Sequence, residues 1–141
     1  MKEPTRCDMT VCFLIRHTPA YQALLGFKKR GFAAGKYAGI GGRVDADETI
    51  RAAASRQLYE ETNILASCSD LHAVGAITFR FPNRPTRDQI VHVFLVTRWT
   101  GEAREKMCPA WYPIDALPLA QMRDDSRYWL PQILVDQPLQ A

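Results

Sequence analysis

The stretch that decides the fold is residues 42–64, which read GRVDADETIRAAASRQLYEETNI. From residue 49 to about residue 62 it has the composition of a helix, because alanine, leucine, glutamine and glutamate are good helix formers and acidic residues precede it. Side chains three and four residues apart return to the same face of a helix. The stretch therefore predicts one helical face that carries Gln57, Glu60 and Glu61.

The charges on this face indicate a cation. Glu60 and Glu61 are adjacent like charges, and a third acid, Glu48, precedes the helix, so a metal ion or Arg56 is needed to balance them. Mg²⁺ prefers oxygen ligands and suits such a site. The alternative is a solvated helix in which Arg56 and Glu60 form an i,i+4 pair worth about 0.3 kcal/mol. The fixed spacing of glycines 41–42, Glu48 and Arg56 before the two glutamates favours the metal site.

Apolar and β-branched runs on both sides of the helix predict strands. Residues 7–17 and 21–27 are typical of a hairpin-like strand pair, and residues 28–37 of a glycine-containing, cationic loop. Residues 38–42, AGIGG, carry little side-chain bulk, so the backbone can approach a ligand closely there. Further strands are expected at residues 72–80, 89–98 and 108–113, a last helix from Asp124 or Asp125 through Leu134, and core aromatic side chains at Phe94, Trp111, Tyr128 and Trp129. This order predicts an α+β or mixed-sheet sandwich with helices on its faces.

The length and composition indicate a single domain, residues 1–141, because 141 residues at 47% hydrophobic content suffice for one core. The net charge of +3 is mild and the basic residues are scattered apart from residues 28–30, which favours small anionic ligands over nucleic acid. No signal peptide, metal-type cysteine spacing or membrane-spanning run is recognisable, so we expect a soluble cytoplasmic protein with reduced thiols. The apolar first strand could pair with a second copy in a homodimer or lie inside one sheet.

The spacing G-x5-E-x7-R-Q-x-x-E-E from Gly42 to Glu61 resembles the Nudix box, the signature of the Nudix hydrolase superfamily. Other stretches resemble its MutT-like branch, and in particular the oxidised-purine nucleoside triphosphatases. These stretches are LLGFKKRGFAAGKY at residues 24–37, VHVF at 91–94, MCPAW at 107–111 and RYWLP at 127–131. Together with the box they extend over most of the chain.

The resemblance implies the α/β class: an α/β/α sandwich with a mixed central sheet, one metal-binding helix after the glycine-rich loop and a carboxy-terminal helix. It implies Mg²⁺ as the cofactor, with Mn²⁺ as an alternative. The implied activity is hydrolysis of a (deoxy)nucleoside triphosphate to monophosphate and pyrophosphate, in a role of nucleotide-pool cleaning. Another nucleoside diphosphate derivative, such as a dinucleotide, a nucleotide sugar or a capped RNA end, is an alternative substrate. A nucleotide-binding module without turnover is the alternative from a different class.

The resemblance also assigns roles to particular residues. Glu60 and Glu61 would bind the metal with the help of the Gly42 carbonyl, and Arg56 would pair with Glu48 and hold the loop against the helix. The ion would neutralise phosphate charge and activate water. Cations that commonly approach the phosphates stand at Lys28 and Arg43.

One departure from the family pattern falls on the helix. Gln57 stands where the family has a carboxylate that serves as a metal ligand or base; an amide can orient water but supplies neither charge nor basicity. Three interpretations stay open: a natural variant whose base lies elsewhere, an enzyme weakened into a binder, and a deliberate isosteric inactivation. A further family acid corresponds to Lys106, and the neighbouring Glu105 replaces it only if its loop shifts, the alternative being a solvated loop.

A second departure concerns the base pocket of the related enzymes. Their asparagine, tryptophan and two successive aspartates correspond to Ala38, Arg123, Asp125 and Ser126, so that only Asp125 is retained. Ala38 lacks an amide for a base edge, and Arg123 offers a planar cation for stacking or phosphate binding. Asp125 either contacts the base or caps the last helix.

Overall fold

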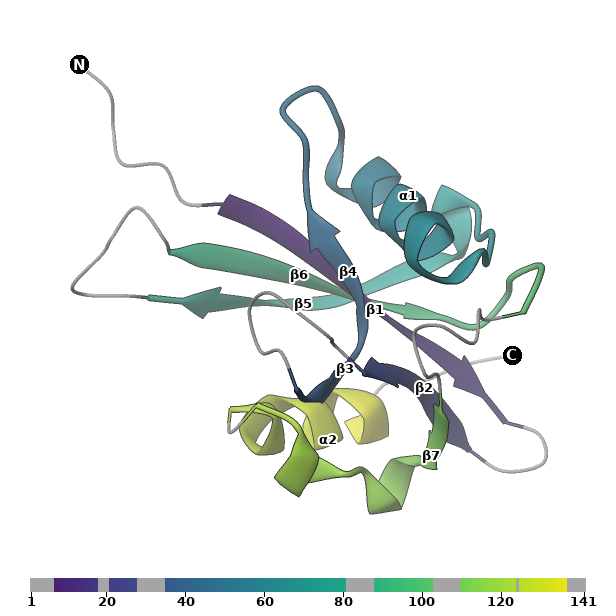
Figure 1. Cartoon of the computed structure of the whole chain (residues 1–141), viewed down its shortest axis with the longest axis vertical. Helices are drawn as coiled ribbons and strands as arrows, with labels where there is room; N and C mark the ends of the chain where they lie inside the picture. The colour runs from purple at the N-terminus through teal and green to yellow at the C-terminus, as the bar shows by residue number, and fades with distance from the viewer. Residues whose placement is uncertain are drawn as a thin grey trace.

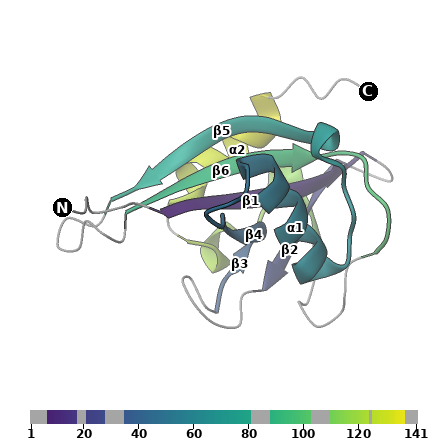
Figure 2. The same ribbon diagram turned by 90° about the horizontal axis from the view of Figure 1, so that it is seen from above.

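The computed structural model describes residues 7–17, 21–27, 35–80, 88–102, 110–123 and 125–136. The strands of this part of the chain are β1 Cys7–Arg16, β2 Gln22–Phe27, β3 Tyr37–Ala38, β4 Ile40–Arg43, β5 Leu71–Phe79, β6 Gln89–Val96 and β7 Ala110–Pro113. They form one mixed sheet, and the helices α1 Ile50–Thr62 and α2 Ser126–Asp136 lie on its two sides (Figures 1 and 2). Short 3-10 turns occupy Cys68–Asp70, Ile114–Ala116 and Leu119–Gln121.

Strand β1 organises the sheet. One of its edges pairs in parallel with β6 along residues 7–14. The other edge pairs first with β4, from Met9 to Cys12, and then with β2 at Ile15 and Arg16, both antiparallel. β5 follows β6, and β3 and β7 pair with β2. The sheet is therefore split along this edge of β1, and the split brings the glycine-rich β4 beside the middle of the chain's first strand (Figure 1).

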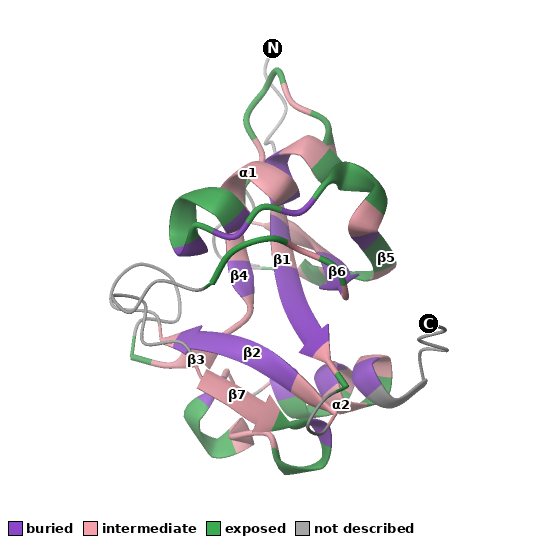
Figure 3. Cartoon of the chain, turned by 90° about the vertical axis from the view of Figure 1, so that its right-hand side faces the viewer, coloured by how far each residue is buried: buried purple, intermediate pink, exposed green. Residues whose placement is uncertain are grey.

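The core has two parts because alternate residues of a strand face opposite sides of a sheet. Cys12 and Leu14 of β1 face α1 and pack with Leu58, whereas Phe13 and Ile15 face α2 and pack among its buried leucines. β1 and β2 are buried along their central parts, while much of the outer surface of α1 is exposed (Figure 3). This two-sided burial accounts for the nearly continuous apolar run at residues 11–15.

Helix α1 has a well-defined beginning and end. The Thr49 hydroxyl accepts a hydrogen bond of 3.1 Å from the Ala52 N–H, as expected for an N-cap. Asn63 has a left-handed backbone with φ of 67°, and its N–H bonds to the Tyr59 carbonyl. Ala53 and Ala54 are fully buried against the sheet, and their small side chains let the helix approach it closely. The helix is therefore held in place at both ends and along one side.

The predicted α/β/α sandwich is confirmed, and most elements lie where the sequence indicates. Tyr37 differs, because it belongs to β3 instead of the loop before it. Phe94 is in the core as expected, but the expectation for Tyr128 is wrong: its side chain is 78% exposed because it lies on the outer face of α2. No helix in the described ranges is long and apolar enough to cross a membrane.

Candidate active site

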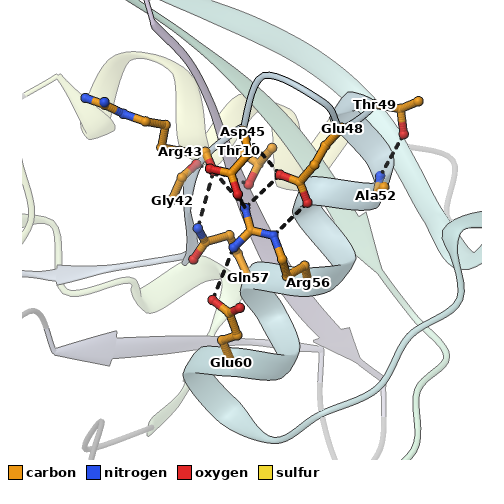
Figure 4. Close-up of polar contacts among 10 residues, drawn as sticks. All are labelled: Thr10, Gly42, Arg43, Asp45, Glu48, Thr49, Ala52, Arg56, Gln57 and Glu60. Carbon is orange, nitrogen blue, oxygen red and sulfur yellow. Dashed lines mark hydrogen bonds and ion pairs between the residues drawn. The ribbon is translucent and has the colours of Figure 1, made fainter.

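Arg56 is the centre of the polar contacts between α1 and the loop before it (Figure 4). Its Nε and one Nη donate to the two carboxylate oxygens of Glu48 over 2.6 and 2.8 Å, which makes a two-bonded pair. Its other Nη lies 3.2 Å from Glu60, one helical turn further on. The Asp45 carboxylate lies 3.5 Å from the guanidinium. The pair with Glu48 and the i,i+4 pair with Glu60 are thus present together.

The carboxylate of Glu48 is held in its charged form. The hydrogen bonds from Arg56, followed by one of 2.9 Å from the Asp45 N–H, lower the pKa of Glu48 from about 4.5 to about 2. The Glu48 carboxylate in turn raises the pKa of Arg56. Both groups are therefore ionised at neutral pH.

This lowered pKa predicts a pH-dependent contribution to stability. A carboxyl group whose pKa is lower in the folded state stabilises the fold above its unfolded value, and that contribution is lost as the pH falls towards the folded value. We expect Glu48→Gln to lower the Tm at neutral pH, and its Tm difference from the native chain to shrink between about pH 4.5 and about pH 2. Thermal unfolding followed by circular dichroism across this range measures the difference. A difference that is constant with pH would contradict the ion pair.

The Arg43 carbonyl receives two hydrogen bonds from α1. Nη2 of Arg56 donates to it over 3.1 Å, and Nε2 of Gln57 donates to it over 3.3 Å. The Gln57 amide also lies directly on Gly42, because a Cβ added there would be 2.6 Å from the amide carbon. We call the contacts of Arg56 and Gln57 with residues 42–48 the loop–helix junction. It connects the end of β4 to the predicted carboxylate face of α1.

β1 contacts the strand that leads into this junction through Thr10, a residue that the sequence did not point to. The backbone of Thr10 lies so close to Gly41 that a Cβ on Gly41 would be 1.8 Å from the Thr10 carbonyl oxygen. The Thr10 side chain is 3% exposed, and its hydroxyl donates to the Gly42 carbonyl over 3.5 Å. The sign of Thr10 in the sequence is that it is a polar residue within the apolar run of the first strand. Asp45, at the edge of the junction, had no comparable signal.

Glu60 and Glu61 are both exposed on the same side of α1, with Gln57 one turn before them. Carboxylate oxygens of this kind suit a hard divalent ion such as Mg²⁺ or Mn²⁺. The described residues contain no group of three or more histidines, cysteines, aspartates or glutamates placed to hold a metal. The type of donor thus fits a divalent ion, whereas the described side chains, two carboxylates of α1 beside a neutral amide, do not complete a ligand set without further oxygens.

A cavity of about 140 Å³ lies between the sheet and the start of α2. Its walls are largely apolar, with Phe13, Phe79 and Trp129 among them, and Ala38 of β3 also lines it. Gly41 and Gly42 form part of its lining, so the cavity adjoins the loop–helix junction. The site consequently has two parts that meet at Gly42: an apolar pocket on one side of the sheet and the carboxylate face of α1 on the other.

The polar groups of the cavity lie at the start of α2. Nε of Arg123 donates to one oxygen of Asp125 over 2.8 Å, and the Trp129 indole N–H donates to the other oxygen over 2.8 Å. The Arg123 guanidinium also lies 4.7 Å from the centre of the Phe79 ring. The Asp125 carboxylate therefore contacts these two side chains, and it positions a cation and an indole at the pocket wall. The neighbouring Ser126 is buried at 5% exposure.

Of the other predicted site residues, the structure describes Arg43. The Arg43 side chain is exposed and points away from the contacts of Arg56 (Figure 4). Lys28, Glu105 and Lys106, as well as the possible helix start at Asp124, lie outside the described residues. Their roles stay predictions.

The family model described as NUDIX domain matches residues 8–133 of the chain. The chain therefore belongs to the NUDIX family, as the spacing of Gly42, Glu48, Arg56 and the two glutamates predicted. The match includes β1, the loop–helix junction and most of α2, which are the parts that build the two-part site.

Two relatives and two solved structures are similar to this chain. It is 43% identical over 115 residues to the oxidized purine nucleoside triphosphate hydrolase of Danio rerio, covering 80% of this chain and 72% of the relative. The mouse protein of the same name is 41% identical over 115 residues with the same coverage. The crystal structure of the MutT NUDIX hydrolase from Burkholderia pseudomallei is 22% identical and superposes with a TM-score of 0.70 over 81% of this chain and 88% of that one. The MutT protein from Bacillus halodurans gives a TM-score of 0.72 at 21% identity, over 92% and 82%. These structures share the fold.

Proposed function

We propose that this protein is a divalent-metal-dependent hydrolase that cleaves a purine (deoxy)nucleoside triphosphate to monophosphate and pyrophosphate, as one domain that cleans the cytoplasmic nucleotide pool. The observation that carries the proposal is the position of Gly42, which lines the apolar pocket and at the same time lies against Gln57 of the loop–helix junction. A nucleotide whose base enters the pocket passes its phosphates over Gly42 towards Glu60 and Glu61. The relatives named as oxidized purine nucleoside triphosphate hydrolases support this substrate class.

In this proposal some residues bind the ion and others position the loop. Glu60, Glu61 and the Gly42 carbonyl would hold the ion, and Arg56 and Glu48 are positioning residues that keep the loop against α1. The bound ion supplies phosphate-charge neutralisation and a more acidic water. Gln57 orients water through its amide, and Glu105 is the candidate for an additional acid. Cations for the phosphates are proposed at Lys28 and Arg43.

Cleavage proceeds by attack of water on a phosphorus of the triphosphate chain. The new bond forms from the water oxygen to that phosphorus, and the bond from the same phosphorus to the oxygen that bridges the α- and β-phosphates breaks. The proton of water passes to solvent or to a neighbouring carboxylate. Attack at the α-phosphorus expels pyrophosphate and attack at the β-phosphorus expels the nucleoside monophosphate, so both routes give the same two products. The chain's own contribution is to hold the reacting groups in line, because positioning and charge stabilisation carry most of the catalysis in phosphoryl transfer.

The lining of the pocket supports a proposal for how the base is bound. Its volume of about 140 Å³ suits a single flat ring system, with Phe79 and Trp129 as apolar walls. Asp125 holds the Arg123 guanidinium and the Trp129 N–H in place, so a base in the pocket would meet a cation and a carboxylate. The Ala38 side chain, which also lines the pocket, offers no polar group. We propose Ala38, Arg123 and Asp125 as the substrate-binding residues. Ala38 and Arg123 stand where the related enzymes have an asparagine and a tryptophan. We therefore propose that the residues of this chain set which base it prefers.

Asp125→Ala tests the pocket. The substitution removes the acceptor that Arg123 and Trp129 share, so we expect KM for the best triphosphate to rise about 10-fold with a smaller change in kcat, the pattern of lost ground-state binding. Tyr128→Ala is the matched control, because Tyr128 is on the same helix and 78% exposed. Steady-state kinetics with both variants measure the difference. Equal kinetics of Asp125→Ala and the native chain would remove the pocket from the binding site.

The experiment that tests the function is metal-dependent product release across a panel of nucleotides, for the native chain, Gln57→Glu and Glu60→Gln. We expect turnover of a purine triphosphate with Mg²⁺, a rise with Gln57→Glu, and a fall of about 100-fold with Glu60→Gln. If Gln57→Glu gains nothing and Glu60→Gln loses nothing, the assignment of the metal to α1 is wrong. The panel includes dinucleotides, nucleotide sugars and capped RNA ends, whose preferential cleavage would change the substrate.

A nucleotide-binding module is the second candidate, and the neutral Gln57 favours it. Such a module keeps the pocket and the carboxylates but lacks a basic group at this position. It predicts nucleotide affinity by calorimetry with no turnover by the native chain or by either variant. Measurable turnover by the native chain would exclude it.

A further inference from the structure

Gln57 uses a group that a glutamate does not have. Its Nε2 donates to the Arg43 carbonyl over 3.3 Å, beside the bond of 3.1 Å from Arg56 to the same oxygen. A carbonyl oxygen only accepts, so the contact requires the N–H of an amide. The hydrogen bond ties the middle of α1 to the end of β4.

A carboxylate at position 57 could not make this contact. It would place a charged acceptor against the Arg43 carbonyl, and two facing acceptors repel unless a cation lies between them. The end of the side chain lies close over Gly42, since a Cβ added there would be 2.6 Å from the amide carbon. With glutamate, the contact of residue 57 with the Arg43 carbonyl would therefore depend on a bound cation and the rest of the loop–helix junction would be held by Arg56, whereas glutamine adds a direct bond.

The neighbouring charges also limit ion binding by the free protein. Arg56 already pairs with Glu48 and lies 3.2 Å from Glu60, so one of the two helix carboxylates has a cationic partner. No three acidic, histidine or cysteine side chains of the described segments gather into a metal-holding group. A divalent ion in water thus finds few charged ligands before a nucleotide is bound.

On the basis of the proposed function, we infer that Gln57 keeps the loop–helix junction closed without a divalent ion, and that the ion enters together with the phosphates of the nucleotide. The phosphate oxygens supply the charge that position 57 lacks, and Glu60 and Glu61 then complete the ligand set. Gln57 is accordingly a positioning residue that sets the order of binding. A glutamate at this position would reverse the order, because the junction itself would then recruit the ion.

The test uses the native chain, Gln57→Glu and Tyr59→Glu. The last variant is a matched control, because Tyr59 is 48% exposed and two residues along α1 from Gln57, on the other side of the helix. Binding of Mn²⁺ to each free protein is measured by electron paramagnetic resonance. The thermal midpoint is measured with a chelator and with millimolar Mg²⁺. The native chain is also titrated with Mn²⁺ in the presence of an α,β-imido nucleoside triphosphate, which resists cleavage.

We expect Gln57→Glu to bind Mn²⁺ at least about 10-fold more tightly than the native chain, and to gain about 5 °C in Tm from Mg²⁺ that the native chain does not gain. Tyr59→Glu should behave as the native chain does, because its charge lies away from the junction. The imido analogue should raise the Mn²⁺ affinity of the native chain by about 10-fold or more. In the chelator, Gln57→Glu should be the least stable of the three.

Two binding or stability results and one structural result would overturn the inference. One is tight Mn²⁺ binding by the free native chain, equal to that of Gln57→Glu; the other is a Tm of Gln57→Glu that does not respond to Mg²⁺. Neither readout requires turnover, so failure of the proposed hydrolysis is distinguishable: a chain that cleaves no nucleotide could still show the ion dependence of Gln57→Glu. Loss of the native structure in Gln57→Glu that Mg²⁺ fails to restore also counts against the inference.

Discussion

Gly41→Ala is expected to destabilise the protein by about 3 kcal/mol or more, and to prevent folding if the native stability is low. The methyl group would lie 1.8 Å from the Thr10 carbonyl oxygen and 2.9 Å from the Val11 Cα, and both neighbours are backbone atoms of β1. Gly41 pairs with Val11 in the β1–β4 ladder, so the strands can make room only by giving up this pairing. Because β4 carries Gly42 and Arg43 to α1, the loop–helix junction would be lost with it.

Gly42→Ala is the matched comparison, one residue along the same strand. The added methyl would meet only the end of the Gln57 side chain, at 2.6 to 2.7 Å, and that side chain can turn away. We expect a loss of about 1 kcal/mol, with a displaced Gln57 and reduced nucleotide turnover. Urea unfolding of both variants measures the two free energies. A Gly41→Ala variant as stable as Gly42→Ala would show that β1 and β4 do not approach as closely as the structure has them.

The second large effect is expected for Arg56→Gln, which should lower kcat/KM by about 100-fold while the chain stays folded. Arg56 contacts the carboxylates of Glu48 and Glu60 and the Arg43 carbonyl, and without it these acceptors face one another without a cation. Glu60 and the loop would then no longer be held in place. The caps of α1, Thr49 and Asn63, remain, so the helix should persist. Steady-state kinetics and circular dichroism together separate the two effects.

Arg51→Gln provides the control for Arg56→Gln. Arg51 lies on the same helix and donates to the carbonyls of Cys68 and Leu71, so its loss should lower stability and leave kcat unchanged. Arg56→Lys adds a graded test, because a lysine keeps the charge but cannot form the two-bonded pair with Glu48. We expect it to retain intermediate activity. If Arg51→Gln loses as much activity as Arg56→Gln, the effect is one of helix stability and Arg56 has no special role.

Much of the fold could be predicted because its signals are local. The extent of α1 follows from a run of helix-forming residues, and the pairing of β1 with β2 follows from two apolar runs close together in the sequence. Tyr128 was misplaced for a related reason: an aromatic residue beside Trp129 gives no sign of which one faces the sheet. The orientation of α2 decides that, and it leaves Tyr128 outside.

The candidate site divides in the same way. The pair of Arg56 with Glu48 could be predicted from the resemblance to the Nudix box, which lies within one chain segment. Thr10 could not, since its contact with Gly42 depends on the register of β1 against β4. The grouping of Arg123, Asp125 and Trp129 with Phe79 likewise requires α2 to lie across the sheet. Sequence spacing carries no information on such distances.

What the sequence by itself determined is the NUDIX family, the extent of α1 and the carboxylate face that Glu60 and Glu61 share. Each is a property of one short segment, where the helical repeat converts spacing into geometry. Only the tertiary structure decided that the pocket and this face meet at Gly42, and that Gln57 closes the loop–helix junction by donating to the Arg43 carbonyl. These contacts join β1, β4, α1 and α2, and such contacts are set by how the elements pack against both faces of one sheet.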